Sequence, residues 1–534
     1  MTSPRAWSVP PQCSYEEFRR SIHTILHNGC CSSVPLSAVR STPAPPLRRD
    51  TPFRRLGYSR WAETVTPRDS IVPVLTGRFV LPDVTIAHAD EPDQEHVDVY
   101  VRDRLVDEIR PSGQLAAGDV TVIDDARGTV VTSALIDMHT HMPADNMLHL
   151  TDLFLLQTLR HGITIVRDAG DPDGTAIPAA LSRVISGALP GPDIRYAYGF
   201  VGAAPARFPN AFSYDHPEQA TEIVDRLLTL GATWVKSYDN IDLPRVAALR
   251  EAAQEAGLGV LGHVPSGLGH DEALLPDAQH LFGVPPPRSL RRDHVLNRSI
   301  DWHAVDSRRV DVIRRASIEN QLTLTPTLDV TMGILELDRY PEALQEETAL
   351  AMPPFYSRVM WHPHHGLPAY RDISRDDFER ARRALDRKRD LVARLHADGV
   401  PILLGTDTQQ PFVAPGVALH RELHAFDQAG IPRREAFAAA TTTAASALGL
   451  TTVGKVRPGM RAELLISRND PHHMPWSVNK DLTAVVVNGA LIRTADLDAA
   501  IARELHRFEG VFTDFTQRLL AQLSLRRLAK GFVR

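Results

Sequence analysis

Two patterns of hydrophobic residues alternate along the middle of the chain. Short apolar runs typical of buried strands are separated by stretches with apolar residues at helical spacing, such as 217–231 and 243–257, each ending at a glycine. The apolar runs are TSALIDMH (132–139), HGITIVRD (161–168), IRYAYGF (194–200), ATWVKSY (232–238), GVLGHV (259–264), DAQHLFG (277–283), LTLTPTL (322–328) and PILLGTD (401–407). Eight such strand and helix units predict an α/β fold, a (β/α)8 barrel of the TIM type over residues 131–450.

Shorter β-type runs flank this region on both sides. They occur within 77–125, for example GRFVLPDVTIA, and again within 454–492, for example DLTAVVVNGALI. Two β-rich segments that enclose everything else are most simply the halves of one small β-sandwich. We therefore expect a β-sandwich built from 71–130 and 451–500, followed by a C-terminal helical tail (501–534).

The first 70 residues are rich in proline, serine and arginine. A short helix is expected around Tyr15–His27, but the prolines that follow oppose regular structure. We predict a partly ordered N-terminal extension (1–70), either a flexible tail or an arm or lid. Within the barrel region, long connections in 285–400 are expected to build the substrate pocket or a lid.

Charge and cysteine content narrow the function classes. The formal net charge is -6, and acidic and basic residues are interspersed along most of the chain, which does not favour binding to nucleic acid or to a membrane. All three cysteines lie before residue 32, so disulfide bonds cannot tie the main body together. The first 20 residues contain no apolar segment of the length that a signal peptide needs, and no later run is long enough to span a membrane. We expect a cytoplasmic protein.

Candidate chemistry lies at the ends of the apolar runs. His139 and His141 are two residues apart where the first run ends, and positions i and i+2 of a strand share a face. Both imidazoles are expected to point into the barrel mouth, where such a pair can chelate a divalent metal ion. An isolated pair of this kind is more often structural, so the prediction of a metal site requires further ligands on the other runs.

Lys236 ends the fourth run, and Lys388 is the only other lysine before residue 455. A bare ammonium group at the end of an apolar strand is costly to bury. Burial and nearby cations lower the pKa of a lysine, and the free amine can add carbon dioxide to give a carbamate. We therefore predict N6-carboxylysine at Lys236 as an anionic bridging ligand.

Three further polar residues end later runs. His263 and His280 fall on the fifth and sixth runs and would serve a second metal ion, while Asp407 closes the eighth. A carboxylate there can bind one metal ion and accept a proton from a bridging water. Each residue alone is common at a strand end, but the ordered set predicts a centre of two divalent metal ions, with zinc as the expected metal.

These motifs resemble those of the amidohydrolase superfamily over roughly residues 71–500. LIDMHTH is similar to the first-strand metal motif of that family, GATWVK to its carboxylated-lysine strand, and LGTDT to its eighth-strand aspartate. WVKSY, LTPTL and RDAGD resemble the branch that holds prolidase-like carboxypeptidases, ochratoxin-hydrolysing amidases and imidazolonepropionase-like enzymes. The chain departs from the branch after the third strand, where GFVGAAPARFPN replaces a loop rich in glycine and histidine.

The resemblance implies an arrangement for the metal centre. One ion would be held by His139, His141 and Asp407, and carboxylated Lys236 would bridge it to a second ion on His263 and His280. A hydroxide shared by the two ions would attack the substrate carbonyl, and Asp407 would take its proton.

Two residues are candidates for substrate binding. Tyr238 lies two residues after Lys236 on the same strand face, so it can donate to the oxyanion or hold a carboxylate; the alternative is a core aromatic. Arg167 and Asp168 end the second run, and Arg167 either pairs with a substrate carboxylate or forms a structural Arg–Asp pair. Histidines 362, 364 and 365 lie in a loop that either overhangs the site or is solvated.

The expected function is hydrolysis of a carbon–nitrogen bond in an amide, peptide or cyclic amide. The substrate would be a small molecule, and the resemblance implies a homo-oligomer. Attack on an ester, lactone or carbamate would use the same hydroxide. A lyase or decarboxylase with one metal ion, or a binding protein that has lost turnover, would belong to a different class, but all six ligand positions carry metal-competent side chains.

Overall fold

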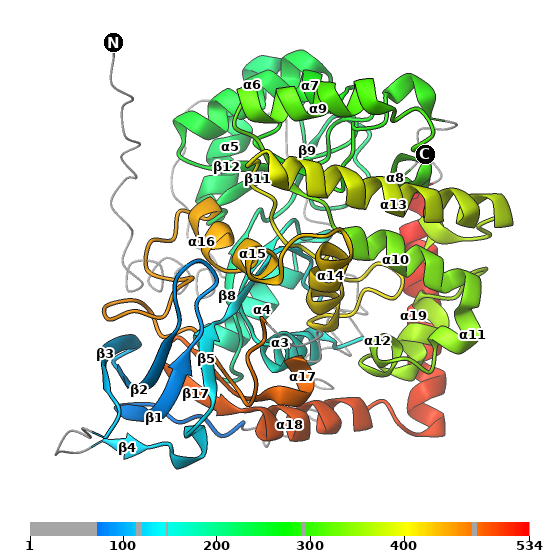
Figure 1. The fold of residues 1–534 in the computed structure, drawn as a ribbon. Coiled ribbons are helices and arrows are strands. Elements are labelled where there is room, and N and C mark those ends of the chain that lie inside the picture. The colour runs from blue at the N-terminus through cyan, green and yellow to red at the C-terminus, as the bar shows by residue number, and fades with distance from the viewer. Residues whose placement is uncertain (1–71, 114–119, 146–147, 291–294, 473–477, 533–534) are drawn as a thin grey trace, which may run out of the picture. The chain divides into compact units, whose positions relative to one another are not determined.

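The computed structural model describes residues 72–113, 120–145, 148–290, 295–472 and 478–532, and Figure 1 labels its elements. The predicted extension (1–70), with its expected helix and the three cysteines, lies outside the described residues. Among the residues described, no helix combines the length and the apolar composition needed to cross a membrane.

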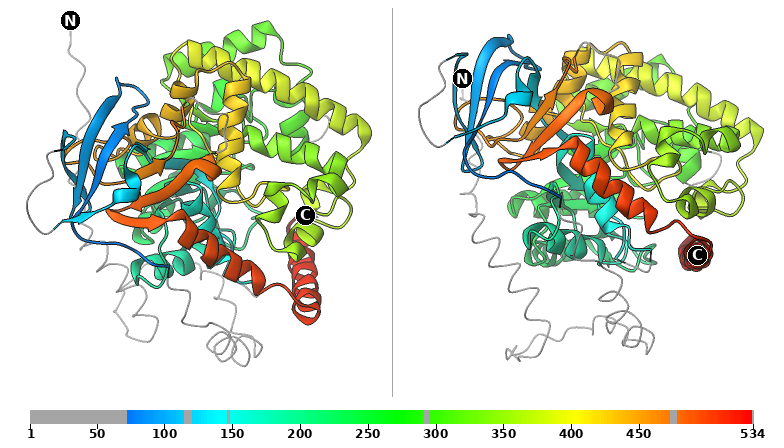
Figure 2. Two further views of the ribbon diagram at one scale, coloured as in Figure 1. Left: turned by 60° about the horizontal axis from the view of Figure 1, so that its bottom comes forward. Right: turned by 90° about the horizontal axis from the view of Figure 1, so that it is seen from below.

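Strands from both ends of the described chain form one eight-stranded sheet. Its strands are β1 (Phe79–Ile86), β2 (Gln94–Arg102), β3 (Leu105–Pro111), β4 (Thr121–Val122), β5 (Val130–Ser133), β15 (Leu464–Ser467), β16 (Leu482–Val487) and β17 (Ala490–Arg493). Hydrogen-bonded neighbours follow the order β17, β16, β15, β5, β1, β2, β3, with β4 beside β1. The antiparallel pair of β5 and β15 joins the two ends, and Figures 1 and 2 show the blue and orange strands together.

The alternation of apolar residues explains this joint sheet. Leu464 and Ile466 of β15 are buried in the same apolar cluster as Val99 and Val101 of β2, because residues two apart on a strand share a face. Both ends of the described chain contribute residues to this cluster. The structure therefore has one sheet with strands from both ends, whereas the β-sandwich domain stays a prediction.

Two parallel sheets carry most of the predicted apolar runs. The first contains, in spatial order, β10 (Ala211–Ser213), β9 (Phe200–Gly202), β11 (Trp234–Ser237), β12 (Gly259–Gly262), β13 (Asp277–Gln279) and β14 (Thr323–Thr325). The second contains β6 (Leu135–Thr140), β7 (Ile163–Asp168) and β8 (Asp193–Tyr196). The fold is therefore mixed α/β with parallel strands, as expected, and the third predicted run divides between β8 and β9.

The eighth predicted run lies between the edges of these two sheets. Residues 401–407 include no named strand, but the Leu403 N–H donates to the Leu324 carbonyl of β14 (2.9 Å) and the Met138 N–H of β6 donates to the Leu404 carbonyl (2.8 Å). On the other side, the Thr233 N–H donates to the Tyr196 carbonyl of β8 (3.0 Å). Backbone hydrogen bonds therefore link both edges of the three-stranded sheet to the six-stranded sheet, at β14 through residues 401–404 and at Thr233, the residue before β11.

Helices alternate with the parallel strands, and further helices follow the last of these strands in the chain. They are α3 (Thr151–Arg160), α4 (Ala176–Ile185), α5 (Ala220–Thr229), α6 (Leu243–Glu255), α7 (His270–Ala273), α8 (Val295–Ile300), α9 (Ser307–Glu319), α10 (Leu328–Glu336), α11 (Tyr340–Ala343), α12 (Glu347–Leu350), α13 (Arg375–Ala397), α14 (Val417–Gln428), α15 (Arg433–Ala439), α16 (Thr442–Ala447), α17 (Val478–Asp481), α18 (Thr494–His506) and α19 (Val511–Phe532). Side-chain caps define several starts: Asp242, Asp306 and Ser374 each accept a hydrogen bond from a backbone N–H three residues later.

The C-terminal tail is helical, as predicted, but its first helix begins earlier. α18 starts at Thr494, inside the range given to the second β part (451–500). Leu497, Ala500 and Ile501 recur at helical spacing and are buried, so one face of α18 packs against the body of the protein.

Candidate metal centre

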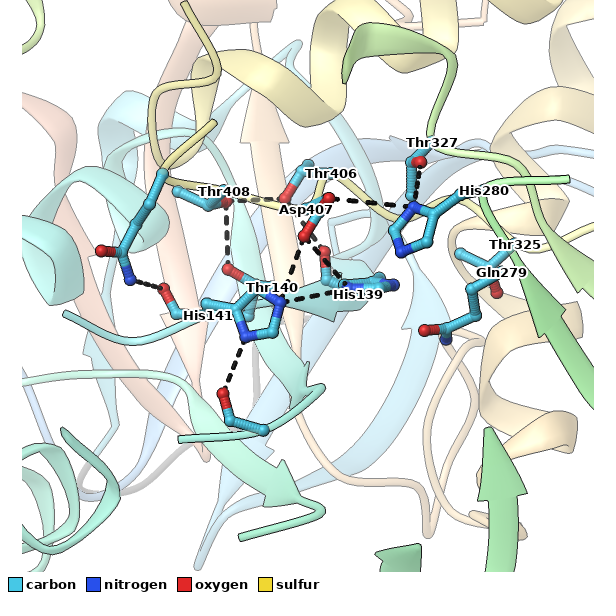
Figure 3. A network of polar contacts seen from close by, with 12 residues as sticks. His139, Thr140, His141, Gln279, His280, Thr325, Thr327, Thr406, Asp407 and Thr408 are labelled. Atoms are coloured by element: carbon cyan, nitrogen blue, oxygen red, sulfur yellow. Dashed lines mark hydrogen bonds and ion pairs between the residues drawn. The ribbon is translucent and has the colours of Figure 1, made fainter. Parts of the chain in front are cut away.

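His139, His141 and Asp407 meet at the ends of β6 and of the 401–407 segment. The Nε2 atoms of His139 and His141 lie 3.4 Å apart. The Asp407 Oδ1 atom lies 3.3 Å from the Nε2 atom of His139 and 3.1 Å from the Nε2 atom of His141. Among the described residues this is the one cluster of three or more histidine, cysteine or acidic side chains whose ligand atoms converge. Figure 3 shows the Asp407 carboxylate between the two rings. The predicted first metal group is brought together.

The backbone around Asp407 is held in an unusual conformation. Asp407 has a φ of 57° and donates its N–H to the His139 carbonyl (2.7 Å). The buried Asp137 carboxylate accepts from the His139 N–H (3.0 Å) and from the Thr406 hydroxyl (2.8 Å), which ties the two segments together. Gly405 fits because a Cβ there would lie 2.6 Å from the His139 Cβ. Left-handed backbone at a non-glycine residue is costly and is concentrated at functional sites.

His280 and His263 continue the cluster along the next strands. The His280 ring centroid is 4.6 Å from that of His139 and 4.9 Å from that of His263. The His280 Nδ1 atom lies 3.8 Å from the Asp407 Oδ2 atom, and His280, like Asp407, has a positive φ (60°). The five predicted histidine and aspartate ligands therefore lie side by side.

Hydrogen bonds at the Nδ1 atoms orient the rings. His141 Nδ1 faces the Gly170 carbonyl (2.8 Å), His263 Nδ1 faces the Asp239 carboxylate (2.7 Å), and His280 Nδ1 faces the Thr327 hydroxyl (2.8 Å). A carbonyl or an ionised carboxylate only accepts, so Nδ1 carries a proton in both His141 and His263. In the neutral ring of His263, Nε2 therefore keeps its lone pair. Metal-binding histidines are held in this way, so the donor set fits divalent cations.

Burial keeps most of these imidazoles neutral, which is the form that binds metal. It lowers the pKa of His263 to about 4 and the pKa values of His139 and His280 well below the ordinary value. For His141, the hydrogen bond and charge of Asp407 outweigh burial and raise the pKa. The Asp239 carboxylate stays ionised, because Arg298 and His263 lower its pKa against the effect of burial.

Lys236 is buried next to this cluster. Its Nζ atom donates to the Gln279 Oε1 atom (2.8 Å), and burial lowers its pKa to about 7. A substantial fraction of the amine is therefore free near neutral pH, as carbamate formation requires. The Gln279 Nε2 atom is buried with no hydrogen-bond partner in the described part of the chain. This amide group can therefore donate to a further acceptor beside Lys236.

Tyr238 faces the same pocket, a cavity of about 180 Å³ that His141, Lys236, His263, His280 and Asp407 also line. Its ring stacks on that of His263 with centroids 4.5 Å apart. Burial raises the pKa of Tyr238 above its ordinary value, so its hydroxyl remains a neutral donor. The predicted position beside the metal ligands is the one observed, and its role stays a prediction.

Arg167 does not line the pocket. Its side chain is fully buried, its guanidinium pairs with the Asp277 carboxylate, and its Nε donates to the Met138 carbonyl (2.8 Å). The neighbouring Asp168 accepts from the backbone N–H groups of Met142 (2.6 Å) and Gly170 (2.9 Å). Of the two alternatives for Arg167, the structural Arg–Asp pair is the one observed, with Asp277 as the acidic partner.

Arg167→Met is expected to destabilise the fold rather than to weaken substrate binding. Removing the guanidinium leaves Asp277 buried and unpaired, which costs about 3–5 kcal/mol in the free energy of unfolding. Urea denaturation measures the loss. Arg183→Met, which breaks a partly exposed pair with Asp152 (2.8 Å), is the control and should change stability by less than about 1 kcal/mol. An Arg167→Met protein with unchanged stability but a raised KM would restore the substrate role.

The supporting residues of the site were not predicted. Asp239, Thr327 and Gln279 each lie within a few residues of a predicted ligand or pocket run, but sequence alone does not say which side chain meets which ring. The long connections do line the pocket, as expected, through residues such as Val295, Thr331 and Lys388. Histidines 362, 364 and 365 are not among its lining residues, and His364 pairs with Asp372 (2.7 Å).

Comparisons with known proteins find relatives in sequence and in fold. Imidazolonepropionase from Cereibacter sphaeroides is 36% identical over 91 residues, which covers 16% of this chain and only 22% of that protein. Bottromycin amidohydrolase has a similar structure, with a TM-score of 0.59, 22% identity and coverage of 86% of this chain and 94% of that one. A Xaa-Pro dipeptidase with bound methionine gives a TM-score of 0.57 at 16% identity, over 78% of this chain and 100% of that one.

The family model described as the amidohydrolase family matches residues 130–492, more than half of the chain. This range begins at β5 and ends in β17, so it contains both parallel sheets and all six predicted metal ligands. The chain belongs to the amidohydrolase family.

Proposed function

We propose that this protein is a metal-dependent hydrolase that cleaves a carbon–nitrogen bond in an amide, a peptide or a cyclic amide. The observation that carries the proposal is the convergence of His139, His141 and Asp407, with the rings of His141 and His263 oriented by hydrogen bonds at Nδ1. The names of its similar proteins, an imidazolonepropionase, a dipeptidase and an amidohydrolase, support this bond class.

In this proposal His139, His141 and Asp407 hold one divalent ion, most simply zinc, and His263 and His280 hold a second. Lys236, as N6-carboxylysine, bridges them. Bound ions supply Lewis acidity and lower the pKa of water toward neutrality. Asp407 accepts the proton of the attacking water, and the neutral Tyr238 hydroxyl donates to the oxyanion.

The scaffold and assembly form part of the same proposal. The edge-to-edge hydrogen bonds through residues 401–404 support one (β/α)8 barrel over 131–450, with a β-sandwich from 71–130 and 451–500, an N-terminal extension (1–70) and a helical tail (501–534). The expectations of a small-molecule substrate, a homo-oligomer and a cytoplasmic location stay predictions.

Metal content and a substrate screen test the proposal together. Protein expressed with added zinc is expected to carry about two ions per chain, as two-metal hydrolases do, and to hydrolyse members of a panel of N-acyl amino acids, dipeptides and lactams. A chelator should remove the activity and added zinc restore it. Elemental analysis and product detection by mass spectrometry are the measurements.

The same panel separates the alternatives. Turnover of esters or lactones with none of the amides would favour the esterase or lactonase reading. Release of carbon dioxide, or of an unsaturated product, with one ion per chain would favour a lyase or decarboxylase. Less than one ion per chain after metal-replete expression, with no turnover, would leave a binding protein.

A further inference from the structure

A second buried lysine lines the pocket besides Lys236. Lys388 lies on α13 and is only 2% exposed, yet it is among the residues that line the same cavity as the metal ligands. Only five of the 59 basic residues of this chain are lysines, and two of these five are buried in this one pocket.

The charge of Lys388 is incompletely satisfied. Its Nζ atom donates to the Thr331 hydroxyl of α10 (2.8 Å) and lies 5.7 Å from the ring centroid of Trp302. No carboxylate of the described residues lies within ion-pair distance of this Nζ atom. An ammonium group has three donors and is expensive to bury without an anionic partner. Two of its donors therefore remain for a group that the protein itself does not provide.

The acidic group whose charge acts on Lys388 is Glu422, and its carboxyl group is engaged elsewhere. The buried Glu422 carboxylate accepts from the backbone N–H groups of Leu328 (2.9 Å) and Asp329 (2.7 Å) at the start of α10. Burial lowers the pKa of Lys388 to about 7, and the charge of Glu422 offsets this effect only in part. An anion bound at Nζ would restore the partner that burial demands.

The surroundings of Lys388 indicate the kind of anion. One ammonium and one hydroxyl match a single carboxylate, whereas a phosphate group carries more charge and needs more donors. Val295 and Val330 also line the cavity and contribute apolar surface to it. A carboxylate on an apolar stem therefore fits this pocket.

We propose that Lys388 and Thr331 form a subsite for a carboxylate group of the substrate. The inference rests on the proposed function and narrows it: the enzyme acts on acidic substrates, such as N-acyl amino acids or peptides, whose carboxylate binds at Lys388 while the C–N bond lies at His139, His141 and Asp407. Lys388 is a specificity-determining residue and takes no part in proton transfer.

Paired substrates test the subsite. With zinc-loaded protein, Lys388→Met is expected to raise KM about 10- to 100-fold for an N-acyl amino acid that the wild type hydrolyses, the effect of losing a charge-assisted hydrogen bond. The effect on KM for the matching C-terminal carboxamide should be much smaller. Lys388→Arg keeps the charge and should recover part of the difference. Lys480→Met, the same substitution at an exposed position, is the control for both substrates.

Binding without turnover gives a second readout. Hexanoate is expected to change the fluorescence of the wild-type protein, because Trp302 lies beside Lys388, and this signal should be lost in Lys388→Met and in Trp302→Phe. Inorganic phosphate and 1-hexanol should give no signal. Metal content and thermal unfolding establish that each variant is folded and loaded.

Two results would overturn the subsite. Equal losses for the acid and the carboxamide would show that Lys388 only fixes α13 to α10 through Thr331. A hexanoate signal that survives in Lys388→Met, or a response to phosphate in place of hexanoate, would place the anion elsewhere or change its class. If no amide is hydrolysed at all, the proposed function fails, while the hexanoate titration still decides whether Lys388 binds a carboxylate.

Discussion

Asp407→Asn is expected to lower kcat by about 10³-fold, because this carboxylate is proposed both as a metal ligand and as the acceptor of the proton from water. Its Oδ1 atom lies within 3.3 Å of the Nε2 atoms of His139 and His141. The amide has nearly the same shape but carries no charge and accepts no proton at this position. Steady-state kinetics on the best substrate of the screen, with metal content measured on the same sample, gives the result.

The control for this substitution is Asp372→Asn. Asp372 pairs with His364 in an exposed loop and lines no part of the pocket, so its variant should keep wild-type kinetics. Near-wild-type kcat in Asp407→Asn would assign the proton transfer to another group. Loss of activity together with loss of fold, seen as a lower midpoint of thermal unfolding, would leave the catalytic role without support.

The convergence of the candidate ligands was predictable because it depends on local geometry. His139 and His141 share a strand face whatever the rest of the fold does, and each later ligand ends an apolar run that leads to the same edge of parallel strands. Asp407 illustrates the limit of this reasoning. The 401–407 segment contributes to the site through a left-handed residue and backbone bonds to His139, not through a regular strand.

The contacts that the sequence did not predict join residues distant in the chain. Arg167 pairs with Asp277, 110 positions away. The run ITIVRD does not indicate which of its two charged residues, Arg167 or Asp168, makes such a pair. His263 is oriented by Asp239 and, through it, by Arg298 of α8. Residue types and spacing predict which residues can bind a metal ion. Which side chains pair between different helices and strands is decided by packing in three dimensions.

Lys388 is a further residue whose position could not be predicted from the sequence. Its rarity was visible in the sequence, since only two lysines precede residue 455, but its position on a long connecting helix gave no reason to place it in the pocket. The packing of α13 against α10 and the bond to Thr331 bring it there. The rarity of lysine supports a hypothesis about function only when the burial and the partners of Lys388 are known.

Lys236 separates a two-metal centre from a one-metal centre. Its Nζ atom is buried beside Gln279, and its pKa of about 7 leaves amine free to add carbon dioxide near neutral pH. In the proposed site the resulting carbamate is the one ligand that contacts both ions. A one-metal lyase or decarboxylase on the same scaffold would not need it.

Lys236→Met is therefore expected to reduce bound zinc from about two ions to about one or fewer per chain and to lower kcat by about 10²-fold or more, as the two-metal clamp is lost. The variant should fold, because methionine fills similar space without a buried amine. Wild-type protein reloaded with zinc should regain activity faster with added bicarbonate, whereas Lys236→Met should not respond, and Lys480→Met should behave as the wild type. If both ions and the activity survive in Lys236→Met, the bridging carbamate is wrong and His139, His141 and Asp407 must suffice for catalysis.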